Sequence, residues 1–557
     1  MPSDAPPPLL IGLDLGTGRC KAVLATPGGA VVHVARRPTV TRQLPGGGAV
    51  HPVPALLATA EALLAECAAA AGNGRVVGIG VASMAEAGVP LDRGGRPIGD
   101  ALAWFDRRPA AEAAWIGAAV GAERLYAITG LRAEAKATLS KLLWLRRRRP
   151  ATIRRMHAWA GIAELLVHHL TGVLATNASL ACRTLAFDIT ARRWDSSLLE
   201  LAGVGPGQMA AVLPFGRAAA GLRADVARRV GLQPGIPVTV AGHDHAVGAF
   251  GVGVMEPGQA VDSMGSAEAV LVVTAAPRLD DRLRQAGISS GCHVLDGRWY
   301  VAAGLQQSGA AVDWFIDACL GGGSGPSRSV AATDGPGAPQ GVGSEEGHVP
   351  GIASGPGTPG GPGRSETDRY ASFLRLLGQA ARGPSGLIVL PYLRGRSAPE
   401  PAPGAGLEIR GLRPEHGSAD IALSILEGTA CATRWMLEEL ERTARVRVRD
   451  LAVIGGGTRN QRWLEIKAAV GRWPLRVPAV EEATALGAAL AAGAAAGMMG
   501  PSAGEPSGEP GHGPGAAVPG RLVAADEGTR RRYERGYRTW LRAARGVAGG
   551  SIAPGRG

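Results

Sequence analysis

A pattern of strand, glycine turn and strand occurs once in each half of the chain, and it constrains the fold more than any other feature. In the first copy the apolar run Leu9–Leu15 leads into Gly16-Thr17-Gly18, and a second apolar run, Cys20–Ala25, follows. The second copy turns at Gly265-Ser266 and continues into Leu271-Val272-Val273. Aligning the two turns matches apolar residues beyond them, which predicts a duplicated domain. Gly-Thr and Gly-Ser turns are common, so this match alone leaves coincidence open.

The chain is long and apolar enough to form two large domains. It has 557 residues, of which 46% are hydrophobic. No apolar run approaches the roughly 20 residues of a membrane span, and Met1–Leu10 lacks the basic region and apolar stretch of a signal peptide. The six cysteines are scattered without a C-x-x-C pair. We therefore expect a cytoplasmic protein with reduced cysteines and no membrane partner.

The basic residues do not form the pattern of a nucleic-acid-binding protein. The net charge is +12, but aromatic residues make up only 4% of the chain, and the densest basic run, Arg146–Arg149, continues a helix-like segment. We expect no nucleic-acid partner. Lysine occurs at only four positions (21, 136, 141 and 467), so each lysine is a candidate for a site that an arginine would not fit.

Two stretches, Gly321–Arg364 and Gly500–Gly520, consist mostly of Gly, Pro, Ser and Ala. Such segments bury too little apolar surface to offset the entropy of ordering. We predict that both are flexible insertions that carry no chemistry.

The first glycine turn is suited to a phosphate group. Gly16 and Thr17 offer backbone N–H groups and a hydroxyl without an obstructing Cβ, and the P-loop and dinucleotide-binding patterns are absent from the sequence. Two such hairpins facing each other across a cleft would form a phosphate site, with Asp14 placed to hold Mg²⁺ directly or through water. The alternative is an ordinary hairpin in which Asp14 caps a turn.

A second carboxylate lies near the midpoint of the chain. The apolar run Pro237–Ala241 leads into Gly242-His243-Asp244-His245. Asp244 at the end of a strand is placed to accept the proton of a hydroxyl that attacks a γ-phosphate. The alternative is a metal site formed by the two histidines, which strand alternation would place on one face, although no third ligand is evident in the sequence.

Several motifs together resemble the FGGY carbohydrate kinases over about residues 9–540. Asp14-Leu15-Gly16-Thr17 with Lys21-Ala22 is similar to the family's D-x-G-T-x-x-x-K-A hairpin, although Arg19 replaces the usual serine. Lys141-Leu142-Leu143-Trp144-Leu145 resembles the core of the first family signature. The second signature resembles Gly411-Leu412, Asp420-Ile421 and Ser424-Ile425-Leu426-Glu427 at the family's spacings.

The resemblance implies a set of ligands and their residues. ATP and Mg²⁺ would be bound, with Gly455–Asn460 similar to the adenosine motif and Ser308–Ala311 similar to the segment along the phosphates. Trp104–Arg108 resembles the W-x-D-x-R acceptor segment, and Glu86 falls where relatives place a hydroxyl-binding residue. An internal salt bridge in a surface loop is the alternative interpretation of Trp104–Arg108. The implied nucleotide-site residues are Gly16, Thr17, Lys21, Gly265, Ser266, Gly309, Gly456, Gly457 and Asn460, the acceptor-site residues are Glu86, Trp104, Asp106, Arg108 and Asp244, the metal ligand is Asp14, and the catalytic base is Asp244.

We therefore predict two duplicated actin-like (ribonuclease H-like) α/β domains, over residues 8–250 and 251–545, that close around ATP and a small sugar. The leading substrate is a ketose such as a pentulose, and a sugar acid or polyol such as gluconate or glycerol is next. Ser83–Gly88 contains neither the Met-His pair associated with xylulose kinases nor the Arg-Glu pair associated with glycerol kinases. The rival classes are an actin-like ATPase switch and a sugar-binding regulator. Family members often form dimers, so a homodimer is possible.

Overall fold

The computed structural model describes residues 6–320, 366–393, 395–498 and 519–547. The insertion predicted at residues 321–364 lies outside the described residues. So does the one predicted at residues 500–520, apart from Pro519 and Gly520, where a strand begins.

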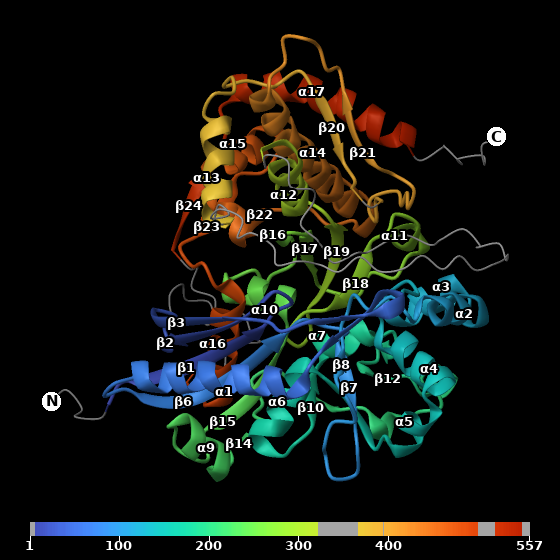
Figure 1. Ribbon diagram of the computed structural model, residues 1–557, viewed down its shortest axis with the longest axis vertical. Helices are drawn as coiled ribbons and strands as arrows, with labels where there is room; N and C mark the ends of the chain where they lie inside the picture. The colour runs from blue at the N-terminus through green and yellow to red at the C-terminus, as the bar shows by residue number, and fades with distance from the viewer. Residues whose placement is uncertain (1–5, 321–365, 394, 499–518, 548–557) are drawn as a thin grey trace, which may run out of the picture.

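The described chain forms two α/β halves, each built on a mixed sheet (Figure 1). The six-stranded sheet of the first half has the order β14-β15-β6-β1-β2-β3. Strands β1, β2 and β3 are antiparallel, whereas β6 and β15 run parallel to β1. The strands are β1 (Pro8–Leu15), β2 (Arg19–Ala25), β3 (Val31–Pro38), β6 (Arg75–Ser83), β14 (Ala220–Gly221) and β15 (Pro237–His243).

The seven-stranded sheet of the second half repeats this topology in the order β18-β19-β17-β16-β22-β23-β24. Its central strands, β19-β17-β16-β22-β23, again comprise three antiparallel strands followed by two parallel ones. The duplication predicted from the two glycine turns is therefore confirmed, because each turn joins the first two strands of its sheet. The strands are β16 (Gln259–Met264), β17 (Glu268–Thr274), β18 (Ser289–Cys292), β19 (Trp299–Leu305), β22 (Asp450–Ile454), β23 (Leu475–Pro478) and β24 (Gly520–Val523).

Two helices lie between the sheets and join the halves: α10 (Asp244–Gly251) and α16 (Ala483–Ala495). Helix α16 belongs to the second half in sequence but packs on β1, β6 and β15 of the first. Its surface is almost entirely alanine and glycine, so it lies directly on the strands. A Cβ added at Gly12 of β1 would stand 1.9 Å from the carbonyl oxygen of Ala485, and one at Gly80 of β6 would stand 1.9 Å from that of Ala488. The strand glycines therefore set the distance between this helix and the first sheet.

The remaining elements cover the two sheets. Helix α1 (Val53–Ala70) is long and apolar enough by length and composition to cross a membrane, but one of its faces packs on β2 and β3 with Leu63 and Leu64 buried, and we interpret it as a covering helix of the first sheet. A third, five-stranded sheet extends the first half. It consists of β4 (Arg42–Leu44), β5 (Gly48–His51), β8 (Ala101–Leu102), β7 (Gly88–Leu91) and β9 (Ala158–Gly161), and the nearby helices are α2 (Ala110–Val120), α3 (Ala122–Thr129), α4 (Thr138–Arg148), α5 (Pro150–Arg155), α6 (Ile162–Thr171), α7 (Ala178–Ala181), α8 (Ser196–Leu201) and α9 (Ala224–Val230).

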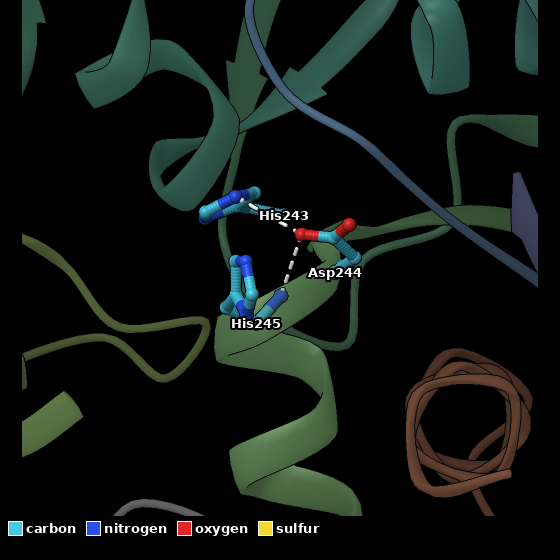
Figure 2. Close-up of side chains that lie close together, drawn as sticks. All are labelled: His243, Asp244 and His245. Atoms are coloured by element: carbon cyan, nitrogen blue, oxygen red, sulfur yellow. Dashed lines mark hydrogen bonds and ion pairs between the residues drawn. The ribbon is translucent and has the colours of Figure 1, made fainter. Parts of the chain in front are cut away.

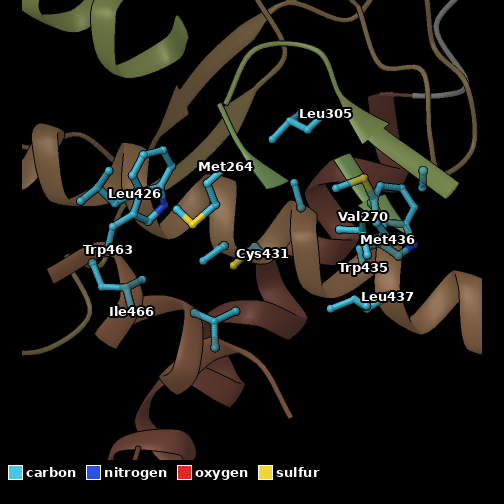
Figure 3. Packing of buried hydrophobic residues seen from close by; sticks show 14 of the residues in the cluster. Met264, Val270, Leu305, Leu426, Cys431, Trp435, Met436, Leu437, Trp463 and Ile466 are labelled. Atoms are coloured by element: carbon cyan, nitrogen blue, oxygen red, sulfur yellow. The ribbon is translucent and has the colours of Figure 1, made fainter. Parts of the chain in front are cut away.

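The core of the second half surrounds α14 (Ser418–Ala444), a 27-residue helix that is buried over most of its length. Leu426 and Trp435 of α14 pack in one cluster with Met264 from the end of β16 and Trp463 (Figure 3). The hydrophobic core thus reaches the glycine turn after β16. The other helices are α11 (Asp281–Gln285), α12 (Gly309–Phe315), α13 (Glu366–Leu377), α15 (Gln461–Val470) and α17 (Glu527–Gly546), and the small strand pairs are β10 (Ala175–Asn177) with β13 (Ala211–Leu213), β11 (Phe187–Asp188) with β12 (Arg193–Trp194), and β20 (Ile388–Pro391) with β21 (Leu407–Arg410).

Candidate active site

The parallel strands of the first sheet bring three predicted site segments to one edge. Leu15 at the end of β1 and His243 at the end of β15 both pair with Ser83 at the end of β6. Asp14, Glu86 and Asp244 therefore all lie close to the carboxyl edge of the same three strands, although they are far apart in sequence. Ligands bind at this edge in open α/β sheets.

The carboxylate of Asp14 has the properties of a cation ligand. It is 6% exposed, and its Oδ1 atom is buried with no hydrogen-bond partner among the described residues. Its Oδ2 atom lies 4.0 Å from Nζ of Lys21, the residue paired with it across the hairpin. Burial raises the pKa of Asp14 to about 7, and the positive charge of Lys21 opposes the rise. A buried, unpartnered oxygen fits Mg²⁺, which prefers carboxylate oxygen and neutralises the group on binding.

Asp244 is the first residue of α10, directly after the last residue of β15 (Figure 2). Its Oδ1 atom accepts a hydrogen bond from the backbone N–H of His245 at 2.7 Å and lies 3.0 Å from Nε2 of His243. Burial favours a higher pKa for Asp244, but the charges and hydrogen bonds of the two histidines outweigh burial and hold this pKa well below its usual range. Asp244 is therefore ionised at neutral pH, as a general base must be, but its lowered pKa makes it a weaker base than an ordinary aspartate.

The two histidines lie together, though not because of strand alternation. The strand ends at His243, and the helical turn that follows brings the ring of His245 to 5.3 Å from that of His243, edge to face. Potential ligand atoms of His243, Asp244 and His245 lie within 4.8 Å of one another, so Asp244 would be the third ligand if a metal ion were bound there. Two of these candidate ligand atoms, Nε2 of His243 and Oδ1 of Asp244, are paired with each other at 3.0 Å, so we favour the base over the metal site.

Glu86, the first of the predicted acceptor residues, is held in place by an arginine. Glu86 has a left-handed backbone, φ 62°, and its Oε1 atom accepts hydrogen bonds from Nε and NH2 of Arg183 at 3.1 and 2.7 Å. Burial opposes ionisation of Glu86, but Arg183 and Lys136 lower its pKa, so the carboxylate is charged. A cavity of about 20 Å³ adjoins Glu86, and it has room for one water molecule rather than a sugar.

Within the Trp104–Arg108 segment, the polar side chains of Asp106 and Arg108 pair with each other, which the resemblance did not imply. Nε of Arg108 donates to Oδ1 and Oδ2 of Asp106 at 3.0 and 3.1 Å, and Asp106 is 1% exposed. The internal salt bridge considered as an alternative is thus present, but buried rather than at the surface. Trp104 donates from Nε1 to Oγ1 of Thr17 at 2.8 Å, which links this segment to the first glycine hairpin.

The second glycine hairpin meets the N-terminus of α12 and the adenosine-like loop. The N–H of Gly309 donates to the carbonyl oxygen of Gly265 at 3.1 Å, and a Cβ at Gly309 would stand 2.6 Å from that oxygen. Gly455, with φ 94°, approaches Met264 just before the hairpin so closely that a Cβ would stand 2.6 Å from its carbonyl oxygen. These glycines are required by close packing of the backbone. A Cβ at Gly456, in contrast, would face open space.

Asn460 has a structural role that the resemblance did not imply. It is 1% exposed, its Oδ1 atom accepts the N–H of Trp463 and so caps α15, and its Nδ2 atom donates to the hydroxyl of Tyr370 at 3.4 Å. Both polar atoms of its amide are therefore engaged. Asn460 shapes the loop, and its assignment to the nucleotide stays a prediction.

A buried ionic network lies behind the second hairpin, and sequence reasoning missed it. Lys467 donates to Oδ2 of Asp262 at 2.7 Å and to Oε1 of Glu268 at 2.6 Å, and Ser308 donates to Oε2 of Glu268 at 2.6 Å. Burial and the neighbouring Glu268 raise the pKa of Asp262 to about 7. The network ties the hairpin, the start of α12 and α15 together. The rarity of lysine was the only signal in the sequence.

The structure also places residues from the two family signatures. Lys141 of α4 is fully buried and donates to the carbonyl oxygen of Lys136, and burial lowers its pKa to about 7. Glu427 of α14 accepts hydrogen bonds from the backbone N–H and the hydroxyl of Ser385. The described contacts of Glu427 are therefore those of a structural residue.

Comparison with known proteins identifies the family. The sequence matches the models of the FGGY family of carbohydrate kinases, N-terminal domain, at residues 9–251 and C-terminal domain at residues 260–496. It is 26% identical over 467 residues to the xylulose kinase of Escherichia coli K12, covering 83% of this chain and 84% of the relative. It is 27% identical over 497 residues to the glycerol kinase of Aromatoleum aromaticum, covering 86% and 88%.

Solved structures share the whole fold. Xylulose kinase from Rhodospirillum rubrum superposes with a TM-score of 0.78 at 24% identity, covering 97% of this chain and 99% of that one. Gluconate kinase from Lactobacillus acidophilus superposes with a TM-score of 0.80 at 16% identity, covering 97% and 98%. The duplicated actin-like fold predicted from the sequence is thus confirmed.

The matched family models and the relatives together define an ATP-dependent phosphotransferase that acts on a sugar hydroxyl. More specifically, this chain belongs to the FGGY family of carbohydrate kinases. The predictions of enzyme class and family are confirmed, and the predicted rivals, an ATPase switch and a regulator, are set aside. The roles of individual site residues stay predictions.

Proposed function

We propose that this kinase transfers the γ-phosphate of ATP to a small ketose, with a pentulose as the preferred acceptor. The observation that carries phosphoryl transfer to a hydroxyl is the position of Asp244, an ionised carboxylate at the same sheet edge as Asp14 and Glu86. The relatives support a ketose, because xylulose kinases and an L-fuculokinase are among the proteins this chain resembles. A sugar acid or a polyol is the second candidate, since a gluconokinase and a glycerol kinase also resemble it.

In the proposed reaction Asp244 accepts the proton of the acceptor hydroxyl as its oxygen attacks the γ-phosphorus and ADP leaves. Glu86 and Arg183, which form an ion pair, hold the acceptor: the carboxylate accepts hydrogen bonds from its hydroxyls and the guanidinium donates hydrogen bonds to them. Thr17, Lys21 and Ser266 bind the phosphates, together with the N–H groups of their hairpins. Asp14 would hold Mg²⁺, which would neutralise part of the phosphate charge.

We further propose that the enzyme works in the cytoplasm on a small molecule alone, without a nucleic-acid or membrane partner. A homodimer remains a prediction from the family resemblance. Size-exclusion chromatography with light scattering measures the oligomeric state directly.

The substrate proposal is tested by an acceptor screen. Purified enzyme with MgATP is supplied with D-xylulose, D-ribulose, L-fuculose, gluconate or glycerol, and ADP release is measured against a control without acceptor. We expect kcat/KM to be at least about ten-fold higher for a pentulose than for gluconate or glycerol, the range that a few pocket contacts supply. Highest efficiency with gluconate or glycerol would replace the ketose with the second candidate.

A further inference from the structure

Glu482 joins the two halves of the protein at the predicted phosphate site. It is the residue directly before α16 and is 7% exposed. Its Oε2 atom lies 2.7 Å from Nζ of Lys21, and its Oε1 atom accepts from Nε of Arg36 at 2.7 Å. Both cations belong to the first sheet, at β2 and β3. One buried carboxylate of the second half is therefore held by two cations of the first.

Lys21 stands between two carboxylates. Its Nζ atom is in contact with Glu482 at 2.7 Å but lies 4.0 Å from Oδ2 of Asp14. The Lys21 side chain is 29% exposed, so it is not fixed by packing alone. If Glu482 lost its charge, the nearest carboxylate for the ammonium group would be Asp14, the predicted Mg²⁺ ligand. A direct Lys21–Asp14 ion pair would compete with a metal ion for the same oxygens.

The first turn of α16 also contacts the predicted base. The hydroxyl of Thr484 donates to the backbone carbonyl of Asp244 at 3.2 Å. Helix α16 is seated against Gly12 of β1, two residues before Asp14. The segment that holds Glu482 is thus fixed relative to both Asp14 and Asp244, and the position of its carboxylate is defined by the fold.

We propose that Glu482 is a positioning residue of the kinase, which holds Lys21 toward the phosphates and away from Asp14, so that Asp14 stays open to Mg²⁺. The inference rests on the proposed roles of Asp14 and Lys21. It assigns a function to a carboxylate that touches neither substrate. It also explains why the buried carboxylate of Glu482 lies near that of Asp14 at a site that must bind an anion.

The test measures how much Mg²⁺ strengthens nucleotide binding, with ADP titrated by calorimetry in Mg²⁺ and in EDTA. Glu482→Gln keeps the shape and removes the charge. We expect the Mg²⁺-dependent gain in ADP affinity to fall about 5- to 10-fold, within the usual range of coupling between two bound ligands. Glu481→Gln is the matched control, because Glu481 is 61% exposed and pairs with Arg36 and Arg459 but not with Lys21. We expect no change in this variant.

A double variant separates positioning from general damage to the structure. If Lys21 blocks Asp14 once Glu482 is neutral, then Lys21→Met added to Glu482→Gln will restore most of the Mg²⁺-dependent gain. If Glu482 had a merely structural role, the loss in the double variant would equal the sum of the losses in Glu482→Gln alone and Lys21→Met alone. Glu482→Asp, which keeps the charge, should retain at least half of the gain even if the glutamine variant proves too unstable to purify. Thermal melting of each variant checks that it is folded.

The outcomes distinguish this inference from the proposed function. Loss of the Mg²⁺-dependent gain in Asp14→Asn together with a normal gain in Glu482→Gln would overturn the role of Glu482 alone. A normal gain in Asp14→Asn would overturn both the metal site and the inference that rests on it. Additive losses in the double variant would also overturn the positioning role.

Discussion

Gly12→Ala tests the packing on which the site depends. The added Cβ would stand 1.9 Å from the carbonyl oxygen of Ala485 and 2.3 Å from the backbone N of Ala489. Ordinary van der Waals contact begins at 3.4 Å, so α16 and β1 would have to separate by about 1.5 Å. The contacted atoms are helix backbone, so no side chain can rotate away to relieve the clash.

This separation has two measurable effects. Overpacking of this kind costs about 1–3 kcal/mol of folding free energy. The shift also moves the first turn of α16, where Glu482 contacts Lys21 and Thr484 contacts the backbone of Asp244. A displacement of about 1 Å at reacting groups costs on the order of 10²-fold in rate. We therefore expect a lower melting temperature together with a kcat that falls by about 10- to 100-fold.

The assay is thermal melting and steady-state turnover with the best acceptor, compared with Gly28→Ala. A Cβ at Gly28 has only Oγ1 of Thr26 within 4 Å, at 3.8 Å, so this control adds the same methyl group without a clash. Gly78→Ala, whose Cβ would stand 2.8 Å from the carbonyl oxygen of Ala492, should have an intermediate effect. The reasoning is refuted if Gly12→Ala melts and turns over like Gly28→Ala.

Three further predictions concern single residues. Glu86→Ala should raise KM for the acceptor at least about ten-fold more than KM for ATP, and equal changes in both would remove it from the acceptor site. Trp104→Ala should also raise the acceptor KM more than the ATP KM, but with some loss of ATP affinity through Thr17; an unchanged acceptor KM would contradict this. Burial raises the pKa of Glu427 to about 7 from an ordinary value of 4.5. Between these two pH values the native state therefore binds more protons than the unfolded state, and the stability that protonated Glu427 contributes is lost as the pH rises to 7. The stability of Glu427→Gln relative to the native sequence should therefore increase from pH 4.5 to 7 and level off above, as measured by denaturant unfolding, and a pH-independent difference would contradict the raised pKa.

The fold could be predicted from the sequence because its signals are local. The turns at Gly16 and Gly265 and the apolar runs on either side specify two hairpins, and the observed β1 and β2 differ from the predicted strands by one residue at each start. Glycine at positions 12 and 80 carries no such signal, since only the packed helix shows why a side chain is excluded there.

The partners of the site residues could not be predicted in the same way. The Arg183–Glu86 pair spans 97 positions and the Arg36–Glu482 pair spans 446, and no local pattern specifies which arginine, among many, reaches which carboxylate. The capping role of Asn460 was predictable in part, because asparagine directly before a helix is a common N-cap. The sequence suggested a nucleotide contact instead, and the cap became evident only from the engaged amide.

The central claim is that Asp244 is the general base of a sugar kinase, and Asp244→Asn tests it most directly. The change keeps the size of the side chain and removes the carboxylate charge, so we expect kcat to fall by about 10²- to 10⁴-fold, the usual contribution of general-base catalysis. MgADP affinity by calorimetry should stay within about three-fold of the native value, because the predicted nucleotide residues lie elsewhere. Asp225→Asn, on the exposed face of α9, controls for loss of an acidic group. Near-normal turnover of Asp244→Asn would contradict the account, and loss of MgADP binding would assign Asp244 to the metal instead.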